Sequence, residues 1–130
     1  MIMTRILIAD DNLNVRRALR ALLEEDADWI VCGEAMDGTE AVLRAHDMKP
    51  DLIILDFQMP AMNGLQAARE IAKECPDTPV LLCTAHLSSA LLGEARRVGI
   101  RGAVPKSISA EIINGVRALL RHESFYSQTF

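Results

Sequence analysis

The feature that most constrains the fold is a regular alternation of two kinds of segment along the chain. Five short segments are rich in apolar residues and have strand character, and they span residues 6–8, 29–35, 52–55, 80–83 and 102–105. Five longer segments repeat apolar residues every three or four positions, as on one face of a helix, and they span residues 15–23, 39–48, 65–72, 91–98 and 112–120. The sequence therefore predicts a strand followed by a helix, five times in succession.

This order predicts the α/β class. The strands at 52–55 and 80–83 are apolar at every position, which indicates that both of their faces are buried, as in a parallel sheet. Right-handed connections then place helices on both sides of an open, doubly wound sheet of five strands, a (βα)5 fold. Pro105 has no main-chain N–H group, so we expect the fifth strand to lie at an edge of the sheet.

Length, charge and cysteine content exclude several classes of protein. A chain of 130 residues is one domain of ordinary size. Its net charge of −4 leaves no basic excess for nucleic-acid phosphates, so we expect no direct nucleic-acid binding by this chain. The three cysteines are odd in number and lack metal-ligand spacing, which is typical of reduced cytosolic thiols. The apolar runs are too short to span a membrane and no signal peptide is recognisable, so we expect a cytoplasmic protein.

Polar side chains stand where four of the five predicted strands end. Asp10 and Asp11 follow the first strand, Asp56 the third, Thr84 the fourth and Lys106 the fifth. Ligands bind at the carboxyl ends of such strands. A single aspartate there is usually a helix cap, but three that converge repel one another unless a metal ion or a proton relieves them. Carboxylates suit Mg²⁺, while the ammonium and hydroxyl groups suit phosphoryl oxygens, so the set predicts phosphoryl transfer onto a carboxylate.

The motifs around these residues resemble those of response-regulator receiver domains of two-component signalling. They are Ala9-Asp10-Asp11-Asn12, the run from Asp56 to Gly64 (Asp-Phe-Gln-Met-Pro-Ala-Met-Asn-Gly), Thr84-Ala85 and Lys106. The resemblance covers about Thr4 to Arg121 and implies a receiver domain at residues 1–122, with a flavodoxin-like fold and the strand order 2-1-3-4-5. It is closest to the subfamily with a C-terminal helix-turn-helix output domain.

The resemblance also implies roles for the site residues. Asp56 would accept a phosphoryl group from a sensor histidine kinase, and Thr84 and Lys106 would bind the phosphoryl oxygens. The chain would thus catalyse its own phosphorylation and dephosphorylation without being a conventional enzyme. The implied ligands of Mg²⁺ (or Mn²⁺) are Asp11, Asp56 and the main-chain carbonyl of Gln58, with Asp10 acting mostly through water.

Further residues bear on hydrolysis and switching. Gln58 and His86 stand where the family tunes hydrolysis of the phosphoryl group, although His86 is equally well explained as a surface loop residue. The family pairs the threonine with an aromatic residue in a switch, but here the second position of that switch is Ala103. Ser107, and not a proline, follows Lys106, so a cis peptide bond at that point is not carried over.

Output and partners follow from the same resemblance. It predicts that the last two helices and the strand between them form the output surface, that phosphorylation allows a homodimer to form, and that an absent output domain binds DNA and so controls transcription. Three of the five aromatic residues lie in the last six positions, at Phe125, Tyr126 and Phe130. Residues 123–130 are either a tail that folds back on the last helix or the start of a linker to that output domain.

Three other functions compete with the receiver. A Mg²⁺-dependent phosphatase with an aspartyl nucleophile needs a second carboxylate two residues after the first, where this chain has Gln58. A nucleotide- or flavin-binding module needs a glycine-rich loop after the first strand, and none is present. A degenerate scaffold receiver is disfavoured because all five site residues are present.

Charged residues on the predicted helices have a simpler interpretation. Those at 16, 17, 20, 96 and 97 are arginines, which indicates solvated helix faces or, alternatively, partner surfaces. Gly64 is expected to serve a turn or a close approach at the start of the third helix.

Overall fold

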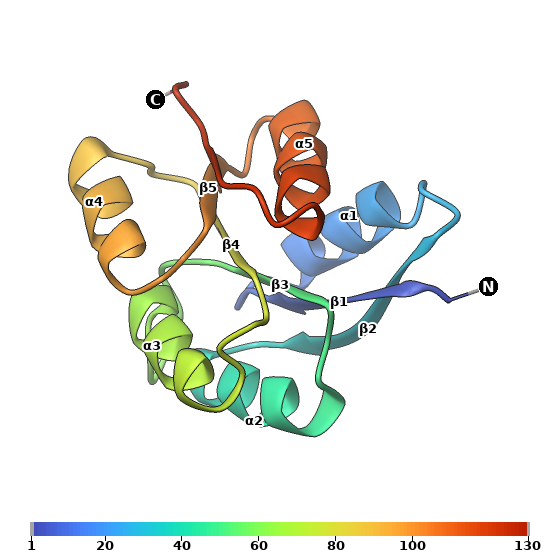
Figure 1. The fold of residues 1–130 in the computed structure, drawn as a ribbon, viewed down its shortest axis with the longest axis horizontal. Helices are drawn as coiled ribbons and strands as arrows, with labels where there is room; N and C mark the ends of the chain where they lie inside the picture. Colours follow the sequence, from blue (N-terminus) through green and yellow to red (C-terminus); the bar gives the residue numbers. More distant parts are fainter. Residues whose placement is uncertain (1, 130) are drawn as a thin grey trace.

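The computed structural model describes residues 2–129 and contains the predicted alternation of strands and helices (Figure 1). The strands are β1 (Thr4–Ala9), β2 (Trp29–Ala35), β3 (Leu52–Leu55), β4 (Val80–Thr84), β5 (Gly102–Pro105) and β6 (Phe125–Tyr126). The helices are α1 (Leu13–Leu23), α2 (Gly38–Met48), α3 (Gly64–Glu74), α4 (Ser89–Arg97) and α5 (Ser109–Leu120). Within residues 2–129, no helix is long and apolar enough to cross a membrane.

All strands are parallel, in the order β2-β1-β3-β4-β5-β6. Helices α1 and α5 cover one face of the sheet, and α2, α3 and α4 cover the other (Figure 1). Strand β3 shows why the sequence requires two layers of helices: Ile53 and Leu55 are buried against α2, α3 and α4, while Leu52 and Ile54 are buried on the α1 and α5 side. The predicted doubly wound α/β fold, including the order 2-1-3-4-5, is confirmed.

The sixth strand was not predicted, and the prediction that β5 lies at the edge is wrong. β6 pairs with β5 at Gly102 and Ala103, and the C-terminal segment follows that edge of the sheet in Figure 1. Pro105 does not prevent this, because the pairing ends before Pro105 is reached. Gly102 makes the approach possible, since a β-carbon there would lie 2.7 Å from the carbonyl oxygen of Phe125.

Short, capped turns carry the chain from the sheet into the helices near the polar residues. After β1, the Asn12 side chain accepts hydrogen bonds from the main-chain N–H groups of Asn14 and Val15 and so begins α1. Asn63 and Gln66 form a reciprocal capping box that begins α3. These caps fix the carboxyl ends of β1 and β3 relative to the helices that follow.

Candidate functional site

Three carboxylates from two neighbouring strands meet at one edge of the sheet. Asp10 and Asp11 follow β1, Asp56 follows β3, and one oxygen atom of each lies within 4.8 Å of the others. Asp10 and Asp56 are buried, whereas Asp11 is exposed. The main-chain N–H of Asp56 donates to the carbonyl of Ala9 at 2.9 Å, so the ladder between β1 and β3 sets the separation of the acids.

The ammonium group of Lys106 bridges the two buried acids. Its Nζ atom lies 2.5 Å from Asp10 Oδ2 and 3.0 Å from Asp56 Oδ2. The main-chain N–H of Lys106 donates to the carbonyl of Thr84 at 3.0 Å, which fixes the start of the β5–α5 loop against β4. One cation therefore balances part of the charge of three carboxylates, and the site keeps a negative excess.

This environment shifts the pKa values of both partners. Burial raises the pKa of Asp56, the negative charge of Asp10 raises it further, and the bond from Lys106 opposes them. Burial alone lowers the pKa of Lys106, but its contacts with Asp10 and Asp56 outweigh burial and raise it. Asp56 is therefore a poorly solvated carboxylate, which is the condition for a strong oxygen nucleophile.

The remaining predicted residues, Thr84, Gln58 and His86, differ in burial. Thr84 is buried at the end of β4. Gln58 and His86 are both exposed, and Gln58 lines an open hollow together with Asp11. The acidic cluster is thus reachable from solvent on the side of Asp11.

The site also needs a glycine. A β-carbon on Gly64 would lie 2.3 Å from the carbonyl oxygen of Asp56, and the N–H of Gly64 donates to the carbonyl of Phe57 at 2.8 Å. The predicted close approach at the start of α3 is confirmed, and it draws the loop after Asp56 against the helix.

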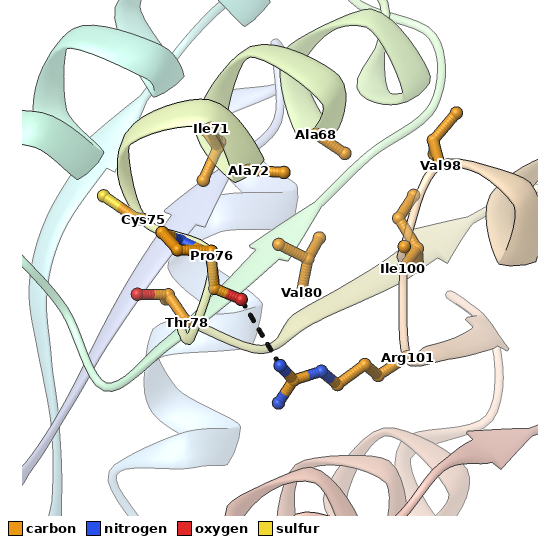
Figure 2. A pocket seen from close by; sticks show the side chains of 11 residues that line it. Ala68, Ile71, Ala72, Cys75, Pro76, Thr78, Val80, Val98, Ile100 and Arg101 are labelled. Carbon is orange, nitrogen blue, oxygen red and sulfur yellow. Dashed lines mark hydrogen bonds between the residues drawn. The ribbon is translucent and has the colours of Figure 1, made fainter.

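A small cavity lies away from this chemistry. It holds about 30 Å³ between the end of α3 and the starts of β4 and β5, at the opposite edge of the sheet, and Figure 2 shows the guanidinium of Arg101 donating to the carbonyl of Pro76 there (3.4 Å). That volume suits about one or two water molecules and is far too small for a metabolite.

Comparison with known proteins decides the family. Residues 6–117 match the family model for the response regulator receiver domain. The chain belongs to this family. The receiver is 38% identical over 111 residues to the transcriptional regulatory protein YdfI of Bacillus subtilis, which covers 85% of this chain and 52% of that protein.

Other relatives differ in how much of their length the receiver matches. The response regulator protein VraR of Staphylococcus aureus is 34% identical, over 94% of this chain and 59% of its own. The receiver thus spans little more than half of YdfI and VraR. In contrast, protein CcdB of Bacillus subtilis, also 34% identical, is matched over 92% of this chain and 100% of its own length.

Solved structures agree with this assignment. A LuxR-family two-component response regulator from Aurantimonas superposes with a TM-score of 0.93 at 31% identity, over 97% of this chain and 91% of that one. The receiver domain of the response regulator NarL from Mycobacterium tuberculosis gives a TM-score of 0.86 at 32% identity, over 93% and 98%.

One position departs from the receiver pattern in an informative way. Ala103 is fully buried in β5, between Leu82 of β4 and Tyr126 of β6. The hydroxyl of Tyr126 donates to the carbonyl of Ile100 at 2.7 Å, and the guanidinium of Arg96 lies 4.2 Å from the centre of the ring. The strand next to Ala103 therefore presents an aromatic residue in contact with α4.

Two residues near the site were missed by the sequence analysis. Arg16 was expected on a solvated face of α1, but it is buried, and its Nη1 atom donates to the carbonyl of Asp10 at 2.7 Å. Glu34 of β2, the one strand at whose end the sequence offered no obvious site residue, accepts a bond from Arg16 at 2.9 Å. The helical spacing could have indicated that Arg16 is buried, because Arg16 lies three and seven residues before the buried Leu19 and Leu23 and so shares their face of α1.

Proposed function

We propose that this receiver is switched by phosphorylation of Asp56, with a sensor histidine kinase as the natural donor. The observation that carries this proposal is the arrangement of Asp56: a buried carboxylate in contact with the Lys106 ammonium and beside two further carboxylates. Nucleophile, countercharge and acidic cluster are the parts that phosphoryl transfer to a carboxylate requires.

The donor set fits a divalent metal ion. Asp10 Oδ2 is buried and shares the ammonium group of Lys106 with Asp56, so three carboxylates stand against one positive charge and the cluster can accept a cation. All-oxygen ligands with one exposed carboxylate suit Mg²⁺ or Mn²⁺, which retain water. We expect Asp11, Asp56 and the main-chain carbonyl of Gln58 to hold the ion, with Asp10 acting through water. Such an ion, when bound, neutralises charge on the transferring phosphoryl group.

The residues of the chain would then divide the work of the transfer. A carboxylate oxygen of Asp56 attacks phosphorus, and the bond from phosphorus to the imidazole nitrogen of the kinase breaks. Lys106 leaves its contact with Asp56 to pair with a phosphoryl oxygen, and the Thr84 hydroxyl donates to another. Gln58, which lines the hollow beside Asp11, and His86, two residues after Thr84, would influence the water that later hydrolyses the acyl phosphate.

Signal output would pass through α4, β5 and α5. Thr84 ends β4, and the loop at 85–88 leads from it directly into α4, so a contact between Thr84 and phosphate pulls on that helix. Because Arg96 of α4 stacks on Tyr126, a shift of α4 would also reach β6. We propose that residues 123–130 carry this change towards a DNA-binding output domain, with a homodimer forming on phosphorylation.

The test uses acetyl phosphate and Mg²⁺, and intact-mass measurement. We expect one phosphoryl group per chain, released by hydroxylamine because it is an acyl phosphate, and none on Asp56→Asn. Asp77→Asn is the matched control, since Asp77 is an exposed aspartate outside the acidic cluster. Phosphorylation of Asp56→Asn at the rate of the original chain would refute the assignment, and many turnovers per chain would favour the phosphatase.

A further inference from the structure

The side chain of Arg16 extends from α1 back to the loop at residues 10–12, which carries Asp10 and Asp11 and is called the acidic loop below. Helical side chains lean towards the N-terminus of their helix, so a residue in the first turns of α1 can contact the loop that precedes it. Arg16 does so with Nη1, which donates to the carbonyl of Asp10, while Nε donates to Glu34 at 2.9 Å. The arginine is only 9% exposed, which is costly for a guanidinium unless its bonds are used well.

Glu34 holds this guanidinium in place from the neighbouring strand. One carboxylate oxygen of Glu34 accepts from Arg16, and the other accepts from Arg20 at 2.8 and 3.1 Å. The bonds from Arg20, opposed by burial and helped by Arg16, lower the pKa of Glu34, so it is ionised at neutral pH. Arg16 and Arg20 thus share one anchor, but only Arg16 contacts the acidic loop.

The carbonyl that Arg16 binds belongs to the peptide group between Asp10 and Asp11. Other bonds already fix Asp10, because its N–H donates to the carbonyl of Ala35 at 3.0 Å and its Oδ1 accepts from the N–H of Asn12 at 2.9 Å. Asp11 is exposed, and within residues 2–129 its side chain makes no hydrogen bond of its own. The orientation of the peptide group held by Arg16 therefore sets where the Asp11 carboxylate stands.

We infer that Arg16, anchored by Glu34, is a positioning residue that orients Asp11 for cation binding. This inference rests on the proposed function, since it concerns the same metal site. Within residues 2–129, Arg16 forms an ion pair with Glu34 and none with the three carboxylates, so it does not occupy the place of the cation. Arg16 would not touch the ion itself but would orient a residue that binds it, as the hydrogen-bond partners of metal ligands commonly do.

A measurement of Mg²⁺ affinity distinguishes a positioning role of Arg16 from a simple effect of its charge, because the two roles predict changes of opposite sign when Arg16 is replaced. Removing a nearby positive charge should strengthen Mg²⁺ binding, whereas releasing the Asp10–Asp11 peptide should weaken it. The variants are Arg16→Gln and, as the matched control, Arg20→Gln, which removes the same charge and also loses the two bonds from Arg20 to Glu34. The dissociation constant is measured on unphosphorylated protein, by titrating Mg²⁺ and following amide chemical shifts.

We expect Arg16→Gln to weaken Mg²⁺ binding on the order of tenfold and Arg20→Gln to leave it unchanged or tighter. Arg16→Lys, which keeps the charge and one donor, should be intermediate and also serves if Arg16→Gln does not fold. Amide exchange at Asp11 and Asn12 should quicken without Mg²⁺ in Arg16→Gln alone. Equal Mg²⁺ affinity in the original chain, Arg16→Gln and Arg16→Lys would overturn the inference, whereas no Mg²⁺ binding by the original chain would overturn the proposed function itself.

Discussion

The loops that follow β1 and β4 are held with very different firmness. After β1, the N–H, the carbonyl and the carboxylate of Asp10 all have hydrogen-bond partners, and Arg16 supplies one of them from α1. After β4, Ala85 and His86 are exposed. The hydrogen bonds that the structure shows for residues 85–88 are those that the hydroxyl and carbonyl of Ser88 accept from the N–H groups of Leu91 and Leu92 in α4. The loop after β1 (residues 10–12) is therefore firmly held and is called the braced loop or side, whereas the loop after β4 (residues 85–88) has few hydrogen bonds and is called the tethered loop or side.

This difference indicates a division of labour within the site. The braced loop carries the acids expected to bind the cation, which need a fixed geometry before any phosphoryl group arrives. The tethered loop leads from Thr84 into α4, where few contacts have to break for the helix to move. We therefore expect such a receiver to have a preformed cation site and to respond to phosphorylation on one flank of the sheet.

The largest effect should come from replacing Asp11, the exposed acid on the braced side that is expected to bind the cation. Asp11→Asn should slow phosphorylation by acetyl phosphate on the order of a hundredfold, because a ligand for the cation is lost. The same change relieves repulsion among the carboxylates, so the metal-free protein should gain on the order of 1 kcal/mol of stability. Phosphorylation rates and urea unfolding without Mg²⁺ measure the two effects, with Asp77→Asn as the control. Unchanged Mg²⁺ affinity in Asp11→Asn would contradict the metal assignment.

A smaller effect should follow from loosening the tethered side. Tyr126→Phe keeps the ring beneath Arg96 but removes the hydroxyl that donates to Ile100, which should cost about 1 kcal/mol in the free energy of unfolding. Amide exchange should quicken at Phe125 to Ser127 and stay unchanged at Asp10 to Asn12. Faster exchange in both regions would show that the two sides are not independent.

The smallest effect concerns pH and the burial of Asp56. Because its pKa is raised in the folded protein, the native state holds this proton more tightly than the unfolded chain does. Its stabilising contribution is complete below the unfolded pKa and is lost as the pH rises through the folded pKa. The stability of Asp56→Asn relative to the original chain should therefore grow as the pH rises from 4 to 7 in Mg²⁺-free urea titrations. A difference that is constant with pH would contradict the raised pKa.

Much of this architecture could be predicted from the sequence, because apolar runs and helical spacing are local signals. Parallel strands end at one edge of a sheet, so the meeting of Asp10, Asp11 and Asp56 also followed from their positions. The two-residue strand β6 could not be predicted, since it carries no alternation and depends on Gly102 and on the bond from Tyr126. The burial of Arg16 was missed because charge was given more weight than its place on the apolar face of α1.

The most direct test of the division of labour is hydrogen–deuterium exchange with and without beryllofluoride, a mimic of the acyl phosphate, in the presence of Mg²⁺ throughout. We predict that exchange changes across residues 85–104 and at β6, while residues 9–16 exchange alike in both states. Asp56→Asn, treated identically, should show no change anywhere. Unchanged exchange across residues 85–104, or a response centred on residues 9–16, would contradict the account.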